Sequence, residues 1–239
     1  MSQPSNRREF LKLGSLAAAS ILVGGKPAAA DAHATAATLG AQPLTAKPLP
    51  AKLAKTTGIS QTTHEEHYKL YQGYIKKTNE IMEKLKTVDL ASANQSYSDL
   101  RALKVELSFA LGGVKNHEVY FDAMGGGGGP APAKLGERIA RDFGSFEKWA
   151  AEFRACGLAA RGWAWLAWDR DLGRLMTYVG DAQNTYPIWN SSVVLPMDVY
   201  EHAYYLDFKT NRGAYIDAFL GNVDWETAAR RADEAGALQ

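Results

Sequence analysis

The sequence predicts an α+β protein, in which an N-terminal helical hairpin is followed by a C-terminal α/β domain with a small antiparallel three-stranded sheet. Three observations lead to this prediction. Two long segments without proline carry apolar residues at helical spacing, a run of five glycines follows them, and short segments rich in aromatic and β-branched residues come after the glycines. Helices first, followed by strands mixed with helices, are typical of an α+β arrangement.

The first 30 residues have the pattern of an export signal. Residues 6–12 read Asn-Arg-Arg-Glu-Phe-Leu-Lys, an apolar stretch follows at 13–23, and residues 28–30 are three alanines. This order is typical of a twin-arginine signal, and the apolar stretch is too short for a membrane anchor. We therefore expect residues 1–30 to be a signal peptide used by the twin-arginine export machinery, and the protein to be periplasmic or extracellular. A chance arginine pair at a helical N-terminus is the alternative.

A linker and the hairpin domain are expected next. Residues 31–57 are rich in Ala, Thr, Pro and Lys without periodicity, which predicts a flexible linker. The hairpin domain is predicted over residues 58–128, with helices at Thr63–Leu85 and Ser98–Met124 and a polar break at Ser92–Ser98. Residues at helical spacing form one stripe on each helix: His67, Tyr71 and Tyr74 in the first, and Leu100, Leu103, Leu107, Leu111, Val114 and His117 in the second.

The C-terminal domain is predicted over residues 129–239. The glycines at 125–129 are expected to form a connecting loop, because a phosphate-binding loop would need a strand before it. Ser145 is expected to cap a helix. The expected helices are Ala133–Phe143, Ser145–Leu158, Val199–Leu220 and Asp224–Ala235, and the expected strands are Trp163–Trp168, Arg174–Val179 and Ser192–Leu195.

Composition excludes several classes of function. The formal net charge of +1 gives no polybasic surface, so no nucleic-acid partner is expected. The single cysteine, Cys156, excludes a disulfide framework within the chain and a four-cysteine zinc or iron–sulfur site. Its apolar, Ala-rich surroundings favour core packing over a reactive thiol.

Histidines and one aspartate are the candidate metal ligands. Asp198 and His202 are four residues apart, so a helical turn starting near Asp198 would bring a carboxylate and an imidazole together. This donor pair suits iron or manganese, although a salt bridge or a helix cap explains the same spacing. His117 continues an apolar helix face, where a satisfied core histidine is the alternative to a ligand. His64 and His67 are three residues apart, whereas the zinc-protease motif needs four.

Five segments together resemble the iron/manganese superoxide dismutase family, over about residues 58–235. They are Asn116-His117, Phe143-Gly-Ser-Phe, Gly162-Trp-Ala-Trp-Leu, Asp198-Val-Tyr-Glu-His-Ala-Tyr-Tyr-Leu-Asp and Asn222-Val-Asp-Trp. The resemblance implies one manganese or iron ion per chain, held by His67, His117, Asp198 and His202. It also implies conversion of superoxide to O2 and hydrogen peroxide by M(III)/M(II) cycling, in a homodimer or homotetramer.

The same resemblance implies roles for residues around the metal. Tyr74 resembles the gateway tyrosine, and Trp163 and Trp165 resemble the aromatic wall that keeps the site dry, with ordinary core tryptophans as the alternative. Glu201 resembles the glutamate that reaches across a dimer to the partner's metal-bound histidine. Tyr205 resembles the tyrosine that lines the substrate funnel at that interface.

Two departures from the family pattern lie in the first helix. The spacing from His67 to Tyr74 is one residue shorter than in typical members, which the loss of a helical bulge would explain. Tyr71 stands where a supporting histidine is typical. These departures motivate an alternative, a catalytically impaired metal-binding relative of the same fold. Two further alternatives are an iron(II) oxygenase and an exported binding module without metal. The third histidine argues against the oxygenase, because that class uses two histidines and one carboxylate.

The choice between iron and manganese is indicated by the position of one glutamine in the sequence. Many iron-type members have a glutamine four residues before the second histidine ligand, where this chain has Gly113. Manganese-type members supply it from the later domain, for which Gln183 is the candidate and Asn184 the alternative. Hydrogen bonds near a metal tune its redox potential, so this pattern favours manganese.

Overall fold

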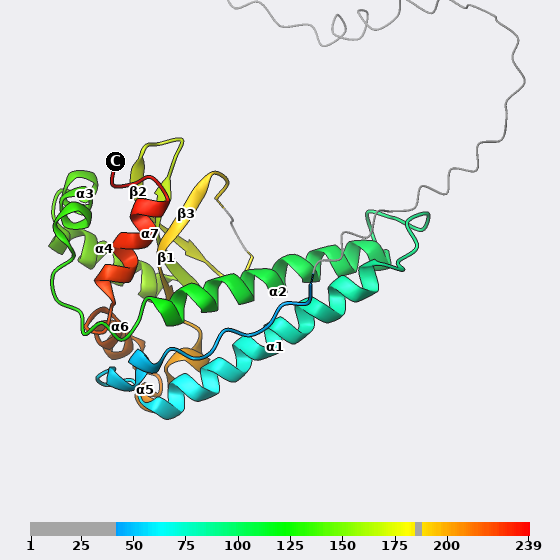
Figure 1. The fold of residues 1–239 in the computed structure, drawn as a ribbon, viewed down its shortest axis with the longest axis horizontal. Coiled ribbons are helices and arrows are strands. Elements are labelled where there is room, and N and C mark those ends of the chain that lie inside the picture. The colour runs from blue at the N-terminus through cyan, green and yellow to red at the C-terminus, as the bar shows by residue number, and fades with distance from the viewer. Residues whose placement is uncertain (1–41, 185–187) are drawn as a thin grey trace, which may run out of the picture. The chain divides into compact units, whose positions relative to one another are not determined.

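The structure, a computed structural model, describes residues 42–184 and 188–239. These residues belong to one compact unit that begins at Gln42. The expected signal peptide and the expected linker up to residue 41 lie outside the described residues. The observed fold is the predicted one, a helical hairpin followed by an α/β domain with a three-stranded antiparallel sheet (Figure 1).

The hairpin consists of helices α1 (Gln61–Leu85) and α2 (Asp99–Asp122), which lie side by side (Figure 1). Each begins after a serine whose side chain accepts a hydrogen bond from a backbone N–H of the first turn, Ser60 for α1 and Ser98 for α2. Helix α1 is α-helical over its whole length, without a bulge. None of the helices in the described ranges is long and apolar enough to cross a membrane.

The C-terminal domain packs helices on a sheet of order β2-β1-β3, with all neighbours antiparallel. The central strand is buried at every position, as expected of a strand covered on both faces. Helices α3, α4 and α7 pack against the sheet, and α2 packs against β3. The elements are α3 (Ala133–Phe143), α4 (Phe146–Ala159), β1 (Trp163–Asp169), β2 (Arg174–Gly180), β3 (Ser191–Asp198), α6 (Arg212–Leu220) and α7 (Trp225–Glu234). Ser145 caps α4 as predicted, accepting from the N–H of Lys148.

The long helix predicted for Val199–Leu220 is wrong. Strand β3 extends to Asp198, and the chain then forms a 3₁₀ turn, η2 (Glu201–Ala203), and a single helical turn, α5 (Tyr205–Phe208). Lys209 adopts a φ of +53°, in the left-handed region, which ends that turn. Asn211 then caps α6, so the segment is three short pieces.

The linker prediction is wrong for residues 42–57, which are part of the fold. They include the 3₁₀ helix η1 (Ala51–Lys55), whose Leu53 is 1% exposed, and Leu44 and Leu49 also pack against the core. Widely spaced leucines in a polar stretch leave no helical or strand period, so composition alone indicated a linker. Gly125, in the glycine loop, has a φ of +88°, and a Cβ there would lie 2.6 Å from the carbonyl oxygen of Lys52. Glycine is therefore required where η1 meets the loop.

Candidate metal centre

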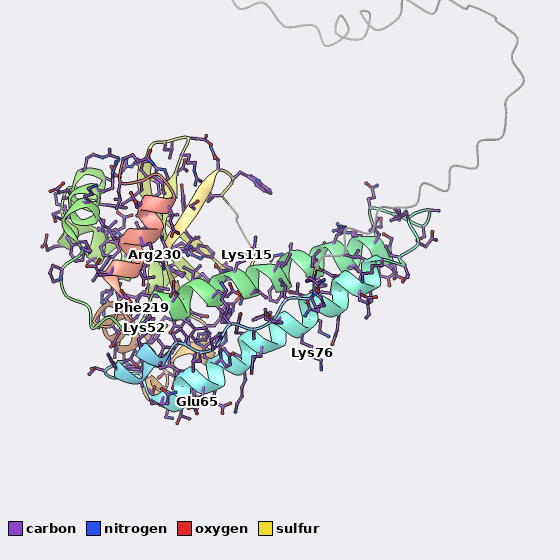
Figure 2. All side chains as sticks on the ribbon, viewed as in Figure 1. Lys52, Glu65, Lys76, Lys115, Phe219 and Arg230 are labelled. Carbon is purple, nitrogen blue, oxygen red and sulfur yellow. The ribbon has the colours of Figure 1, made fainter. Side chains whose placement is uncertain are left out.

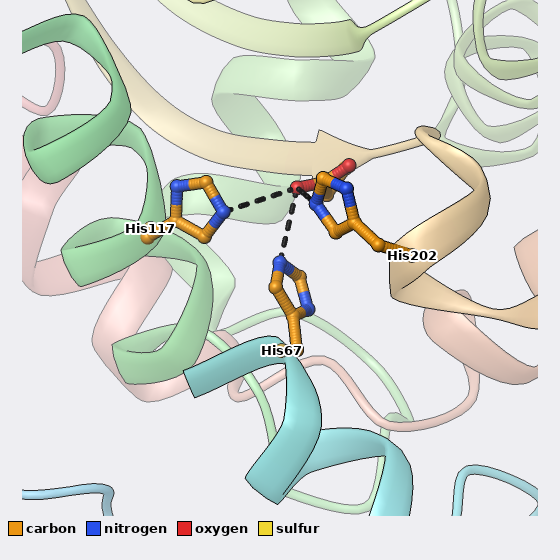
Figure 3. Close-up of side chains that lie close together, drawn as sticks. His67, His117 and His202 are labelled. Carbon is orange, nitrogen blue, oxygen red and sulfur yellow. Dashed lines mark hydrogen bonds and ion pairs between the residues drawn. The ribbon is translucent and has the colours of Figure 1, made fainter. Parts of the chain in front are cut away.

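Four side chains from four elements meet in the interior: His67 from α1, His117 from α2, Asp198 from the end of β3 and His202 from η2 (Figure 3). Their ligating atoms lie within 4.8 Å of one another. Oδ2 of Asp198 is 3.2 Å from Nε2 of both His67 and His202, and 3.6 Å from Nε2 of His117. Three of the four side chains are fully buried, and that of His202 is 26% exposed.

Asp198 is held as an ionised, oriented carboxylate. Its Oδ1 accepts a hydrogen bond from the N–H of Tyr200 at 2.9 Å, and its carbonyl oxygen accepts one from the Tyr215 hydroxyl at 2.6 Å. Burial alone would raise the pKa of Asp198, but the facing imidazoles of His202 and His67 outweigh it and hold the pKa below its usual range. Oδ2, which is within hydrogen-bond distance of Nε2 of His67 and of His202, therefore carries negative charge toward the three histidines.

The protonation and surroundings of His117 show whether these residues fit a metal ion. Its Nδ1 lies 2.7 Å from the carbonyl oxygen of Gly113, which can only accept, so the ring proton is on Nδ1 and Nε2 carries a lone pair. Burial lowers the pKa of His117 to about 3, which keeps the ring neutral. Its buried Nε2 has no hydrogen-bond partner in the described part of the chain and faces Oδ2 of Asp198. A lone pair facing a carboxylate is unfavourable unless a cation lies between them, and three imidazoles with one carboxylate suit iron or manganese.

A polar network lies beside the cluster. Gln183 is 4% exposed; its Oε1 accepts from Nε1 of Trp163 at 3.0 Å, and its Nε2 donates to the Tyr74 hydroxyl at 3.2 Å. The Tyr74 ring lies 5.3 Å from that of His117. The alternative residue, Asn184, points elsewhere and donates to the Ser108 hydroxyl at 2.5 Å. Of the two candidates, Gln183 is therefore the one that contacts Tyr74.

Two residues beside the site were not among the predicted site residues. Asn116 accepts from Nε1 of Trp165 at 3.1 Å and donates to the carbonyl oxygen of Gln183 at 3.3 Å. The Tyr200 ring stacks on His202, with centroids 5.3 Å apart. Their place in the two ligand-bearing motifs was the available signal: Asn116 directly precedes one ligand, and Tyr200 lies two residues before another.

Aromatic rings surround the ligands. The Tyr120 and Phe121 rings lie 5.0 Å and 5.1 Å from that of His67, and the Trp163 ring lies 5.3 Å from that of His117. Trp163 stacks on Trp165 at 6.4 Å. All four aromatic side chains are buried, so His67 and His117 lie in surroundings of low polarity, away from the partly exposed His202 side of the cluster.

The structure shows where the two departures of α1 from the family pattern lie. Without a bulge, Tyr74 lies on the same helical face as His67, which is seven residues earlier. The Tyr71 hydroxyl instead donates to Glu118 at 2.9 Å and accepts from the N–H of Lys47 at 2.9 Å. Tyr71 therefore joins the hairpin to the N-terminal segment and does not touch the four-residue cluster.

Glu201 and Tyr205 lie outside the cluster. Both are exposed in the single chain, Tyr205 by 44%. With Leu70 and Leu206 they line a surface hollow that reaches His202. The structure thus places the two residues beside the least buried ligand, on an exposed surface of the chain.

The fold and the site define a protein with a buried centre of three histidines and one aspartate, built between a helical hairpin and an α/β domain. Two family models match the chain: the alpha-hairpin domain of iron/manganese superoxide dismutases over residues 50–125, and their C-terminal domain over residues 131–231. The chain belongs to the iron/manganese superoxide dismutase family and is an oxidoreductase of that type.

Proteins similar to the chain include superoxide dismutases named for iron and others named for manganese. A protein named superoxide dismutase [Fe] from Aquifex aeolicus is 41% identical over 74% of this chain and 86% of its own length. A superoxide dismutase [Fe] from Cupriavidus metallidurans is 40% identical over 77% of this chain and 94% of its own. A superoxide dismutase [Mn] from Halobacterium salinarum is 35% identical over 72% and 84%.

Proposed function

We propose that this superoxide dismutase converts superoxide to O2 and hydrogen peroxide at one metal ion held by His67, His117, Asp198 and His202. The observation that carries the assignment of ligands is the buried lone pair of His117, which faces the ionised Oδ2 of Asp198. A bound iron or manganese ion supplies alternating one-electron reduction and oxidation between M(III) and M(II), so that two superoxide ions yield one O2 and one peroxide with uptake of two protons.

The protein's own groups hold protons and exclude water. Burial raises the pKa of Tyr74, so its hydroxyl stays protonated at neutral pH. That oxygen accepts from Nε2 of Gln183, which leaves the tyrosine proton free to point toward the site. Gln183 is in turn fixed by Trp163. We infer that Tyr74 and Gln183 form the proton-holding side of the site and that Trp163 keeps it aligned.

We infer that manganese is the working metal. A Cβ on Gly113 would lie 2.7 Å from the Tyr74 ring, so no side chain fits there and the glutamine comes from the later domain, as Gln183. The resemblance associates that arrangement with manganese. The names of the relatives include both metals, so reconstitution with each metal is the deciding measurement.

The test is superoxide consumption by the purified full chain, reconstituted separately with manganese and with iron. We expect turnover to be faster with manganese than with iron. We expect His202→Ala, which removes one ligand, to abolish it. Equal metal content in both preparations makes the rates comparable. Stoichiometric binding of both metals without turnover would support the catalytically impaired relative and refute the enzymatic role of this site.

We also propose that the chain forms a homodimer through the face around His202, with a homotetramer as the alternative assembly. Support comes from the exposed apolar side chains Leu70, Tyr205 and Leu206, which lie with Glu201 around the hollow. Apolar patches of this kind are typical of interaction surfaces. Sedimentation should show that Leu206→Glu shifts the chain toward monomer. Leu158→Glu is the matched control, since Leu158 and Leu206 are 47% and 49% exposed and lie in different elements.

We further propose that the protein is exported through the twin-arginine machinery. Support comes from the sequence of residues 6–12 and the alanines at 28–30. Fractionation of cells that produce the full chain should find it outside the cytoplasm, and replacement of Arg7 and Arg8 by lysines should retain it inside. Unchanged export of the lysine variant would contradict the proposal.

A further inference from the structure

The four predicted ligands are divided between the two parts of the fold. His67 and His117 belong to the hairpin, whereas Asp198 and His202 belong to the C-terminal domain. A metal that binds all four joins the two parts, so separation of the parts would remove two of its ligands. Contacts that hold the hairpin to the C-terminal domain oppose this separation.

Lys52 of η1 makes one such set of contacts. Its Nζ donates to Oδ2 of Asp224 at 2.6 Å, to the carbonyl oxygen of Asp122, and to Oγ1 of Thr227 at 3.4 Å. Asp122 is the last residue of α2, and Asp224 caps the start of α7. The ammonium thus joins a helix end of the hairpin to a helix start of the C-terminal domain. Arg230, labelled with Lys52 in Figure 2, also pairs with Asp122, at 3.1 Å.

Asn222 makes the second set. This side chain is 2% exposed; its Oδ1 accepts from the N–H of Thr57 at 2.8 Å and its Nδ2 donates to the carbonyl oxygen of Thr57 at 2.8 Å. The backbone next to it adds a hydrogen bond from Gly125 N–H to Asn222 O at 2.8 Å and one from Asp224 N–H to Ala123 O at 2.7 Å. The Asn-Val-Asp-Trp motif, which holds no ligand, therefore fastens the segment before α1 and the end of α2.

The partly buried partners make this junction stronger than a surface ion pair. The side chains of Lys52 and Asp224 are 26% and 18% exposed, and the neighbouring Leu53 is 1% exposed. Exposed ion pairs contribute little, whereas partly buried charged hydrogen bonds contribute more, and removing one member leaves the other unpaired. Lys77 and Glu80 of α1 offer the contrast, with side chains 61% and 38% exposed.

We propose that residues 52–57, fastened by Asn222 and Asp224, form a clasp that keeps the hairpin closed on the C-terminal domain and so sets the rate at which the metal is released. Lys52 and Asn222 are positioning residues, since neither touches the four-residue cluster. The inference rests on the proposed metal site and requires nothing of turnover.

The test follows manganese release from the loaded full chain into excess chelator, with a metal-sensitive dye as readout. Lys52→Met keeps the length of the side chain and removes its charge, and it should accelerate release about tenfold. Lys52→Arg should retain slow release, because a guanidinium can still donate to the Asp224 carboxylate and to the carbonyl oxygen of Asp122. Lys77→Met is the matched control, with an ion pair lost away from the junction, and should release manganese at the unmodified rate.

The outcomes separate the clasp from the metal site. Unchanged release from a Lys52→Met variant that binds manganese fully would overturn the clasp alone, whereas failure of the unmodified chain to bind manganese would overturn the proposed site and the clasp with it. If Lys52→Met does not fold, hydrogen exchange of the unmodified loaded chain decides. If the Thr57 and Gly125 amides exchange as fast as manganese is released, the clasp is supported. If they exchange far more slowly than manganese is released, the clasp is overturned, because the metal then leaves with the clasp closed.

Discussion

His64 provides a pH test that does not depend on bound metal. It lies in the first turn of α1, is 0% exposed, and its Nε2 is 2.8 Å from Oγ1 of Thr56. Nδ1 has no hydrogen-bond partner among the described residues. Burial, with repulsion from His67 added, lowers the pKa of His64 from 6.5 to about 4. The folded chain therefore keeps this ring neutral at pH values where the unfolded chain binds a proton.

The sign and size of the effect follow from linkage. The folded pKa of His64 is below the unfolded value, so its contribution to stability is full above pH 6.5 and falls as the pH drops toward about 4. One pKa unit corresponds to 1.36 kcal/mol, and lowering the pH from about 7 to about 5 should reduce the free energy of unfolding by about 2 kcal/mol through His64 alone. His64→Gln can still hydrogen-bond Thr56 and has no proton to take up, so it should lack this loss.

The assay is urea unfolding of the metal-free full chain at about pH 7 and about pH 5. His67 and His117 are present in both proteins, so the difference between the pH-dependent losses of the unmodified chain and of His64→Gln reports His64 together with its repulsion from His67. Glu65→Gln, at the exposed neighbouring position, should retain the unmodified chain's loss. An equal loss in the unmodified chain and in His64→Gln would refute the argument, because the ring would then titrate alike in the folded and unfolded states.

Three further substitutions probe the site. Gln183→Leu should lower turnover on the order of tenfold at unchanged metal content, because the Trp163 and Tyr74 side chains lose their partner; full activity would contradict this. Gly113→Ala, whose Cβ would lie 2.7 Å from the Tyr74 ring, should destabilise the chain by about 1–3 kcal/mol in thermal unfolding, and an unchanged midpoint would count against the close packing. Manganese should raise the unfolding temperature of the unmodified chain but not of Asp198→Asn, whose amide cannot balance the cation; calorimetry with and without metal decides.

Local patterns predicted most of the hairpin. Stripes at helical spacing and polar caps are properties of neighbouring residues, so α1 and α2 were predicted close to their observed bounds, with His67 and His117 facing inward. The meeting of the two histidines with Asp198 and His202 had no such local signal. It came from the resemblance to a family, since the residues of the first helix and of the last strand are far apart in the chain.

The segment around Asp198 shows where spacing alone fails. Asp198 and His202 are four residues apart, which predicts one turn of helix, yet Asp198 ends β3 and His202 lies in η2. The two side chains still meet, at 3.2 Å, because the 3₁₀ turn that follows the extended Tyr200 brings the chain back. Pairing of β3 with β1 overrides the helical tendency of the segment, and a single sequence does not reveal that tertiary contact.

The clasp could not be predicted for the same reason, and its place in the chain has a consequence for assembly. Thr57 and Asn222 are 165 residues apart, and neither belongs to a periodic pattern. The clasp can close only after almost the whole chain is present. Residues near the C-terminus therefore hold in place the hairpin, which carries His67 and His117. A chain that folds before export would close the clasp in the compartment where its metal is bound. After export, the residues that fasten the clasp would then keep the metal that was bound before export. Affinity alone would favour its replacement by copper or zinc.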